Sequence, residues 1–440
     1  MYNALLPSHI ATDTVLAEDD TGDTLTRAEF SGLGADWATR IPGRCVVAIL
    51  CSNTTKSLRA YAGIHTAGHV IILLSAKIAE AALADIVARF AVEVIVQGDT
   101  ITRVAEPAGQ LHPDLSVCLS TSGSTGSPKL VRFSTRQLVA NAQAIAQYLS
   151  LDETERPLAH LPYEYSFGLS VLHSHMSVGA KVLLTEHSIM QKPFWERLAE
   201  ATSLAGVPFH FEMLLRMRLG RANLPNLRSL TQAGGRLRES DAVTLYNLAH
   251  DKGWGFHIMY GQTEAGPRMT WLPFDRMDGN FDCIGQPIPG VALSLSDTDE
   301  LIASSPAIMM GYGETRADLA RGDDLNGTLH TGDLAEITQS GLFRITGRKS
   351  RFIKLQGNRV SLSNIEARME AQGFEVCCVG QDDALSIFTE DTDTEAVRQT
   401  AITSFSFPAR SMKVIHVPSL PRLPNGKMDY TTLLEQAKDI

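Results

Sequence analysis

The sequence predicts an α/β protein, because apolar strands alternate with helices along the first hundred residues. Two continuous apolar runs, at 43–52 and 70–74, have the composition of strands that are covered on both faces. A third strand is expected at 92–96, with helices at 57–67 and 78–90 completing the alternation. This order of elements is typical of sheets built from parallel strands.

Length and composition indicate a soluble enzyme of two or more domains. The chain has 440 residues, of which 44% are hydrophobic and 20% are charged, as in ordinary globular proteins. Its net charge of −10 is spread along the chain, which argues against nucleic acid or an anionic membrane as a partner. No apolar run approaches the roughly 20 residues of a membrane span, and the N-terminus has no signal-peptide pattern. We therefore expect a cytoplasmic protein without a membrane span.

The six cysteines show neither CxxC nor zinc-ligand spacing, and Cys377 and Cys378 are adjacent in an apolar run. We expect all of them to be reduced, buried thiols.

A stretch rich in glycine and hydroxyl residues at 119–131 predicts a phosphate-binding loop. Gly123 and Gly126 can adopt positive φ, and the neighbouring hydroxyls add donors beside exposed backbone N–H groups. Pro128 directly precedes Lys129, so this is not the Walker motif, and a different nucleotide chemistry is implied. Standing alone, the stretch would equally suit a surface turn. The predicted phosphate-binding residues are Thr121, Ser122, Gly123, Ser124, Thr125, Gly126 and Lys129.

Three further motifs follow in a fixed order: YGQTE at 260–264, TGDL at 331–334 with GR at 347–348, and LPNGK at 423–427. With the loop, they resemble the adenylate-forming (AMP-binding) enzyme superfamily of acyl-CoA synthetases, aryl acid ligases, luciferases and peptide-synthetase adenylation domains. The resemblance implies a large N-terminal AMP-binding domain at 1–348, with α/β sheet subdomains and a β-rich subdomain. A small, mobile α+β lid domain is expected at 349–440.

The resemblance also implies ATP and Mg²⁺ as cofactors and assigns residues to them. Tyr260 would lie against the adenine, beside Gly261, and Thr263 would hydrogen-bond the α-phosphate. Glu264 would hold Mg²⁺, a hard cation that prefers carboxylate and phosphate oxygens. Asp333 would accept both ribose hydroxyls, with Arg348 as its partner.

Two residues near the C-terminus are assigned to the reacting groups. By resemblance, Lys427 bridges the substrate carboxylate and the α-phosphate, and Gly357 lets a pantetheine arm pass. The family's hinge position usually holds Asp or Lys, whereas this chain has Ser350. That departure leaves the ease of domain rotation open.

The predicted substrate pocket is small to medium in size and mostly uncharged. The stretch at 160–170 resembles the one whose aromatic residue opens or closes the acyl pocket, and Tyr165 has that position. The segments 206–215 and 229–237 resemble a strand and a turn that line the pocket. Three further residues are expected in the wall of the pocket, Gly234, Gly235 and Met259, and the two glycines are also expected to let the adenine ring approach the backbone.

Peptide-synthetase domains usually have an aspartate near Tyr165 for the amino group of the substrate, and Glu164 is one residue out of register. A fatty, aryl or hydroxy acid is therefore expected in preference to an amino acid.

The sequence also predicts a helix cap and the packing of two histidines. Ser134 or Thr135 is expected to cap a helix that carries an apolar stripe from Leu138 onward. His173 and His175 are expected to be packing or surface residues rather than metal ligands.

The predicted function is an ATP-dependent ligase that converts a small carboxylic acid to an acyl-adenylate and then to a thioester on CoA or an acyl carrier protein. A free-standing amino acid activating enzyme that loads a carrier protein is the alternative within the same class. A binding protein that keeps the fold without turnover is the alternative from another class. A serine hydrolase is excluded because the chain has no GxSxG elbow.

Overall fold

The computed structural model describes residues 6, 10–106, 109–120, 129–355, 358–405, 412–423 and 428–438. The chain forms two compact units. Among the described residues, the first unit falls within 6–120, 129–292 and 303–329, and the second within 293–302 and 330–438. The mixed α/β architecture confirms the predicted fold class.

The first unit contains a seven-stranded sheet with the order β18-β8-β7-β4-β3-β5-β6. Strands β5, β3, β4 and β7 are parallel, and the remaining pairings are antiparallel. The three predicted apolar strands are confirmed as β3, β4 and β5. The bounds are β3 (Val46–Cys51), β4 (Val70–Ser75), β5 (Val94–Gln97), β6 (Thr100–Arg103), β7 (Leu115–Ser120), β8 (Leu130–Ser134) and β18 (Gly311–Gly313).

A nine-stranded sheet of the same unit has the order β15-β14-β13-β12-β11-β9-β10-β1-β2. Neighbouring strands are parallel along the stretch β13-β12-β11-β9-β10-β1 of this order. The strands β11, β12 and β13 therefore all end at one edge of the sheet. The bounds are β1 (Val15–Glu18), β2 (Thr24–Thr26), β9 (Pro157–Ala159), β10 (Val182–Leu184), β11 (Ser203–Gly206), β12 (Ser229–Gln232), β13 (Gly255–Tyr260), β14 (Thr270–Leu272) and β15 (Gln286–Pro287).

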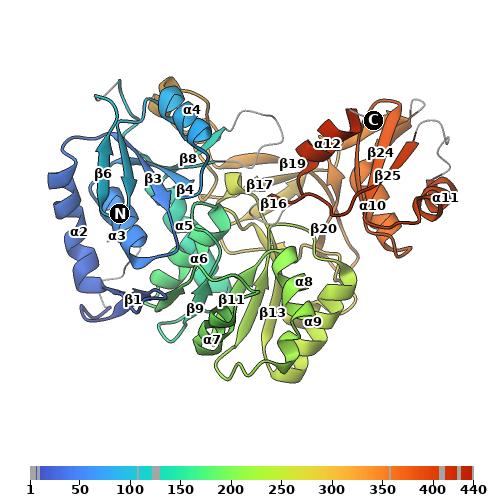
Figure 1. Ribbon diagram of the computed structural model, residues 1–440, viewed down its shortest axis with the longest axis horizontal. Coiled ribbons are helices and arrows are strands. Elements are labelled where there is room, and N and C mark those ends of the chain that lie inside the picture. The colour runs from blue at the N-terminus through green and yellow to red at the C-terminus, as the bar shows by residue number, and fades with distance from the viewer. Residues whose placement is uncertain are drawn as a thin grey trace. The chain divides into compact units, whose positions relative to one another are not determined.

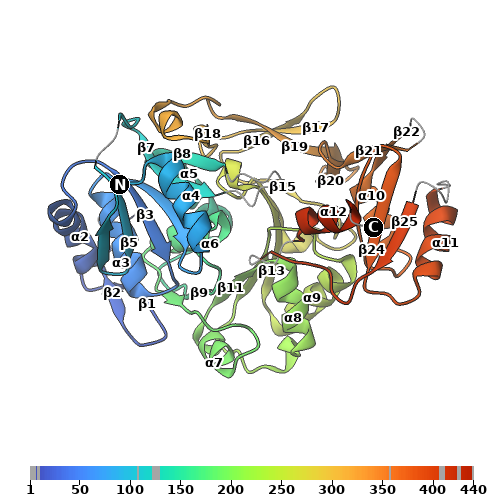
Figure 2. The ribbon, with the colours of Figure 1, turned by 45° about the horizontal axis from the view of Figure 1, so that its top comes forward.

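Helices α3, α5 and α6 join the two large sheets in one apolar core (Figures 1 and 2). Leu58, Leu138 and Leu169 of these helices belong to the same buried cluster as Val47 of β3 and Leu184 of β10. The helices of this unit are α2 (Arg27–Arg40), α3 (Thr55–Thr66), α4 (Glu80–Phe90), α5 (Thr135–Tyr148), α6 (Ser166–Met176), α7 (Lys192–Glu200), α8 (Pro208–Arg216) and α9 (Glu239–Lys252).

The segment 206–215 is not a strand, contrary to the sequence-based expectation. The strand ends at Gly206, and α8 begins at Pro208. Proline fits the first helical position because its missing N–H has no partner there and its φ is already helical. Phe211 and Leu214 then face the core at helical spacing.

The two packing expectations are confirmed. Ser134 accepts a hydrogen bond from the backbone N–H of Gln137, whose own side chain completes a capping box at the start of α5. His173 and His175 lie on α6 with 2% and 5% of their surfaces exposed. Burial lowers the pKa of His173 to about 3 and that of His175 to about 4, so both are neutral packing residues.

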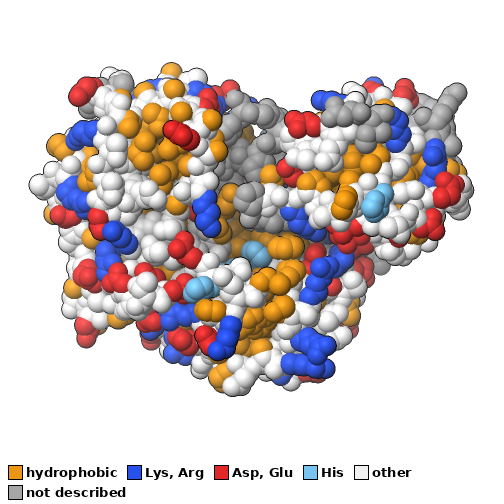
Figure 3. Space-filling model, viewed as in Figure 1, with side chains coloured by type: hydrophobic (Ala, Val, Ile, Leu, Met, Phe, Trp, Pro, Cys, Tyr) orange, Lys and Arg blue, Asp and Glu red, His pale blue; other side chains and the backbone are white. Residues whose placement is uncertain are grey.

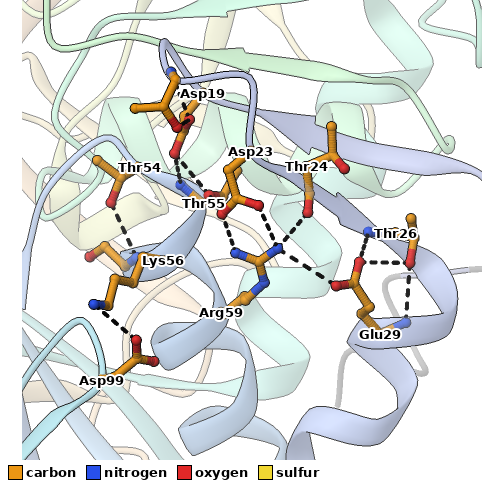
Figure 4. Close-up of polar contacts among 12 residues, drawn as sticks. Asp19, Asp23, Thr24, Thr26, Glu29, Thr54, Thr55, Lys56, Arg59 and Asp99 are labelled. Carbon is orange, nitrogen blue, oxygen red and sulfur yellow. Dashed lines mark hydrogen bonds and ion pairs between the residues drawn. The ribbon is translucent and has the colours of Figure 1, made fainter.

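A polar network connects β2, α2 and α3 (Figure 4). Arg59 on α3 lies between the carboxylates of Asp23 and Glu29, with a distance of 2.5 Å from Nη1 to the Asp23 Oδ2. The Asp23 carboxylate also accepts a hydrogen bond of 2.6 Å from the Thr55 hydroxyl. Thr26 and Glu29 form a capping box that begins α2.

The second unit has an α+β composition. Its four-stranded sheet, β16-β17-β19-β20, is followed by the hairpin β21-β22 and the three-stranded sheet β23-β24-β25. The elements are β16 (Ala292–Leu295), β17 (Glu300–Ser304), β19 (Thr328–Ile337), β20 (Phe343–Arg348), β21 (Phe352–Leu355), β22 (Asn358–Ser361), α10 (Leu362–Glu370), β23 (Val376–Gln381), β24 (Ala384–Thr389), α11 (Thr394–Phe405), β25 (Met412–His416) and α12 (Tyr430–Lys438). The predicted domain boundary between 348 and 349 stays a prediction.

All six cysteines are free and buried. The expectation of buried thiols is therefore confirmed. Burial raises the pKa of the Cys118 thiol to about 12, which makes it unreactive as a nucleophile.

Charged side chains of both signs are interspersed on the face drawn in Figure 3. No helix in the described part of the chain is long and apolar enough to cross a membrane.

We predict that Asp23→Asn weakens the acid sensitivity of unfolding. Arg59 and Thr55 lower the pKa of Asp23 from 3.8 to about 2. The ionised carboxylate therefore stabilises the fold above pH 3.8, and this contribution is lost as the pH falls through 2. Between pH 4 and pH 2, the unfolding free energy of the variant should fall less than that of the wild type. Urea titrations at each pH measure this, and Asp251→Asn, at a site 81% exposed, is the control. Equal slopes for wild type and Asp23→Asn would contradict the prediction.

Candidate active site

The candidate site begins where β13 ends, at Tyr260. The next residue has no room for a side chain, because a Cβ at Gly261 would lie 1.7 Å from the carbonyl oxygen of Pro267. The chain turns back here, and the Met269 N–H donates to the Tyr260 carbonyl at 2.9 Å. This close approach folds residues 261–269 into a compact loop, which we call the 261–269 loop.

The short helix η2 (Thr263–Ala265) lies in this loop and fixes Thr263 and Glu264. It ends at Gly266, whose φ of 71° lies in the left-handed region. The Glu264 carbonyl accepts a hydrogen bond of 2.9 Å from the Met309 N–H. The Thr263 hydroxyl lies 2.9 Å from that of Ser166, the first residue of α6. Two segments distant in sequence thus hold the loop.

The Glu264 side chain belongs to a polar cluster with Tyr312, Lys129 and Glu314. The Tyr312 hydroxyl donates to Oε1 of Glu264 at 2.7 Å. Lys129 places its Nζ 2.8 Å from the Glu314 carboxylate and 5.7 Å from the centre of the Tyr312 ring. Burial, together with the charge of Glu264, raises the pKa of Tyr312, so this phenol stays a donor. The structure brings Glu264 and Lys129 into one cluster through Tyr312.

Sequence reasoning missed Tyr312 and Glu314. They reach the cluster because β18 pairs antiparallel with β8, directly after Lys129. A tyrosine between two glycines at 311–313 is the local signal, but the strand pairing that gives it meaning joins residues about 180 positions apart.

The donor set at Glu264 fits Mg²⁺ together with phosphate and water oxygens. The side chain is partly exposed. Among the described residues, no group of three His, Cys, Asp or Glu side chains could hold a metal alone. Mg²⁺ commonly uses one or two carboxylates and completes its shell with substrate phosphates and waters. One carboxylate in a cluster with Lys129, at the end of the predicted phosphate loop, is therefore compatible with this cation.

The turn after β12 contains Gly234 and Gly235. Gly234 has a φ of 84°, and a Cβ at Gly235 would lie 3.2 Å from the Pro208 ring. The buried Gln232 side chain donates to the Gly235 carbonyl at 2.9 Å and holds the turn. The structure thus explains both glycines by backbone conformation and close packing, while their assignment to nucleotide or acyl group stays a prediction.

Tyr165 immediately precedes α6 and is partly buried. Glu164 beside it is 6% exposed. Burial raises the pKa of Glu164, and Ser75 and Lys77 oppose this shift. Glu164 therefore ionises less readily than a surface carboxyl group.

Met259 is buried, and a charged side chain lies beside this position of the predicted, mostly uncharged pocket. Its Sδ accepts a hydrogen bond of 2.8 Å from the Tyr148 hydroxyl. The Nη1 atom of Arg268 lies 3.6 Å from the same sulfur. A guanidinium group thus lies next to the predicted pocket position.

In the second unit, Asp333 and Arg348 form an ion pair across β19 and β20. The Arg348 Nε lies 2.6 Å from Oδ1 of Asp333. The carboxylate is 3% exposed, whereas the arginine side chain is 55% exposed. The predicted partners therefore do meet, and their role at a ribose stays a prediction.

Several predicted site residues lie outside the described residues. They are Thr121, Ser122, Gly123, Ser124, Thr125 and Gly126 of the phosphate loop, together with Gly357 and Lys427.

Comparison with known proteins supports the family that the motifs resemble. The model of the AMP-binding enzyme family matches residues 103–313, a range that includes the predicted phosphate loop, the 261–269 loop and Tyr312. The match, which covers just under half of the chain, supports its place in the adenylate-forming, AMP-binding enzyme superfamily.

Relatives of this AMP-binding chain include CoA ligases. A 2-succinylbenzoate–CoA ligase of Listeria monocytogenes is 23% identical, with 95% of each chain covered. A long-chain-fatty-acid–CoA ligase of Escherichia coli is 27% identical, with 74% of this chain and 62% of that enzyme covered. A feruloyl-CoA synthase of Amycolatopsis is 27% identical, with 81% and 80% covered.

Solved structures agree on the fold. ATP-bound MatB from Rhodopseudomonas palustris has a TM-score of 0.81 at 20% identity, covering 100% of this chain and 98% of that one. The o-succinylbenzoate CoA synthetase MenE of Bacillus subtilis has a TM-score of 0.78 at 17% identity, covering 96% and 95%.

We predict that Gly261→Ala in this AMP-binding enzyme lowers both stability and nucleotide binding. The added Cβ would meet the Pro267 carbonyl and force the 261–269 loop open. A backbone collision of this kind should cost about 1–3 kcal/mol of unfolding free energy. Urea unfolding and calorimetric titration with AMP measure the two effects.

Gly32→Ala is the matched control, because nothing lies within 4 Å of a Cβ at this helical position. It should stabilise the protein by about 0.5–1 kcal/mol. If Gly261→Ala resembled Gly32→Ala in both measurements, the steric account of the loop would be wrong.

Proposed function

We propose that this chain is an ATP-dependent carboxylic acid ligase. It forms an acyl-adenylate and pyrophosphate, and then transfers the acyl group to the thiol of CoA or of a carrier-protein phosphopantetheine. The observation that carries this proposal is the cluster in which Tyr312 connects Glu264 with Lys129. It places an anion and a cation together at the end of the predicted phosphate loop, in a chain of the AMP-binding superfamily. The CoA ligases among the relatives support the reaction class.

The first half-reaction needs positioning more than acid–base chemistry. A substrate carboxylate is already a nucleophile: one of its oxygens bonds to the α-phosphorus while the bond to pyrophosphate breaks. Negative charge spreads over the phosphoryl oxygens in the transition state, so fixed donors and cations stabilise it. Lys129 is suited to the departing pyrophosphate, and the hydroxyl of Thr263 to the α-phosphate. Mg²⁺ held by Glu264 would neutralise phosphate charge.

The second half-reaction requires a change at the reacting centre. Lys427 serves adenylation, and Gly357 serves passage of the thiol arm. A rotation of the C-terminal domain about Ser350 removes Lys427 from the reacting centre and brings Gly357 to it. Ser350 is exposed, in the turn between β20 and β21. The flanking N–H groups of Lys349 and Arg351 are bonded to the Gly332 and Arg348 carbonyls, so a change there is confined to a short segment.

Amino acid activation is the competing function, and Glu164 weighs against it. An α-ammonium group needs an ionised partner when it is buried. Burial raises the pKa of Glu164, which makes it a poorer partner than the ionised aspartate of an amino acid site. A cytoplasmic location is part of the proposal, since all six cysteines are free thiols.

We predict that Lys427→Ala abolishes acyl-AMP formation while ATP still binds. The lysine acts on charge at the reacting centre, and loss of one such donor typically lowers the rate about 10²- to 10³-fold. Acid-dependent pyrophosphate exchange measures adenylation, and calorimetry measures ATP binding. Lys413→Ala removes an exposed lysine of β25 and is the control. Conversion of preformed acyl-AMP to thioester should survive in Lys427→Ala, and wild-type exchange by this variant would refute the role.

We also predict that Ser350→Pro permits adenylation but blocks thioester formation. Proline fixes φ near −65° and prevents the backbone change that carries the rotation. Both half-reactions are measured separately, by pyrophosphate exchange and by consumption of preformed acyl-AMP. Ser350→Ala, which leaves φ free, should retain both. Equal loss of the two half-reactions in Ser350→Pro would indicate misfolding, whereas retention of both by the variant would contradict the hinge assignment.

A further inference from the structure

Arg268 is a buried cation, and its contacts within the described part of the chain are with neutral side chains. It lies in the 261–269 loop with 2% of its surface exposed. Its Nη1 donates to the Tyr148 hydroxyl at 3.2 Å and lies 3.6 Å from the Met259 sulfur. Its Cζ lies 4.9 Å from the centre of the Phe167 ring, a cation–π contact. The Nε atom is buried without a hydrogen-bond partner.

Two other arginines of this unit, the buried Arg132 and the partly buried Arg316, have carboxylate partners. Nη2 of Arg132 lies 2.6 Å from Asp324, and Nη2 of Arg316 lies 2.7 Å from Glu93. No carboxylate lies within 4 Å of Arg268 among the residues that the structure describes. A buried guanidinium without a counter-ion is strongly unfavourable unless something else supplies the negative charge.

Arg268 lines a cavity of about 220 Å³ that contains no acidic side chain in its described wall. Asn141 of α5 lines the same cavity, is 4% exposed, and has no acceptor for its Nδ2. Arg268 and Asn141 thus line one cavity, and each has a buried N–H donor without a hydrogen-bond partner. A ligand atom that fits these donors is an acceptor with negative charge, and a planar carboxylate matches the fork of a guanidinium group.

The cavity adjoins the loop that carries Thr263 and Glu264. A Cβ at Gly266 would lie 3.0 Å from the Ala307 carbonyl oxygen and 3.5 Å from the Cβ of Asn141. Ala307 and Asn141 both line the cavity. The loop that positions the predicted reacting centre is therefore also part of the wall around the unused donors.

We propose that the acid activated by this chain carries a second carboxylate, and that Arg268 and Asn141 bind it. Phe167, Tyr148 and Met259 surround the guanidinium, so the part of the substrate between the two carboxylates is apolar, either alkyl or aryl. This inference rests on the proposed function and narrows its substrate class to dicarboxylic acids. It adds one charged position to a pocket expected to be mostly uncharged, and it makes Arg268 a specificity-determining residue.

The test compares matched acids in the pyrophosphate exchange assay. Each pair consists of an alkyl or aryl dicarboxylic acid and its monomethyl ester, which has the same length without the second charge. The wild type should prefer the diacid about 10- to 100-fold in kcat/KM, the effect expected of hydrogen bonds to charged groups. Arg268→Met should lose this preference mainly through KM, Arg268→Lys should keep part of it, and Asn141→Asp should weaken the diacid selectively. Arg136 is an exposed arginine of α5, the helix that carries Asn141, and Arg136→Met should leave the preference unchanged.

A stability measurement separates this role from a purely structural one. Replacing an unpaired buried charge with methionine should leave the melting temperature of the ligand-free protein unchanged or raise it. A structural arginine would instead lower it on substitution. A wild type that exchanges pyrophosphate with the monoesters at least as well as with the diacids would overturn the inference and leave the proposed ligase function standing. Absence of exchange with any acid would overturn both.

Discussion

The contact between Gly261 and the Pro267 carbonyl is the constraint on which the site depends. Because no side chain fits between them, the chain can turn back directly after β13. That turn sets Glu264 against Tyr312 and the Met309 backbone, and it buries Arg268 beside Met259. A single steric requirement therefore connects the candidate reacting centre with the candidate specificity residue.

The electrostatics of the first unit divide into satisfied and unsatisfied groups. Arg132 and Arg316 are held by carboxylates, and their ion pairs have structural roles. Glu264 is partly exposed and accepts a hydrogen bond from the neutral phenol of Tyr312, so its charge remains available to a cation. Arg268 and Asn141 retain unused donors inside a cavity. Charges that the fold leaves without ionic partners tend to mark binding positions, because keeping them buried is unfavourable for stability alone.

Local sequence was enough to predict much of the fold. Continuous apolar runs predicted β3 and β4, because strands covered on both faces need no polar alternation. The segment at 206–215 resembles a strand because apolar residues dominate it, but Pro208 suits the first position of a helix and α8 forms there. Tyr312 and Arg268 could not be found in this way, because their significance comes from β18 pairing with β8 and from Tyr148 and Phe167, which lie about a hundred or more positions away. The motif residues at 121–126, Gly357 and Lys427 rest on the resemblance alone.

Transfer of an oxygen isotope shows whether a substrate carboxylate attacks the α-phosphorus of ATP. An acid that supports pyrophosphate exchange is labelled with ¹⁸O in its carboxyl group and converted completely to the thioester. Mass spectrometry of the products should find one ¹⁸O atom in each AMP and none in pyrophosphate, because the attacking oxygen stays on phosphorus when the thiol takes the acyl group. Unlabelled AMP, or label in inorganic phosphate with ADP as the nucleotide product, would contradict the account.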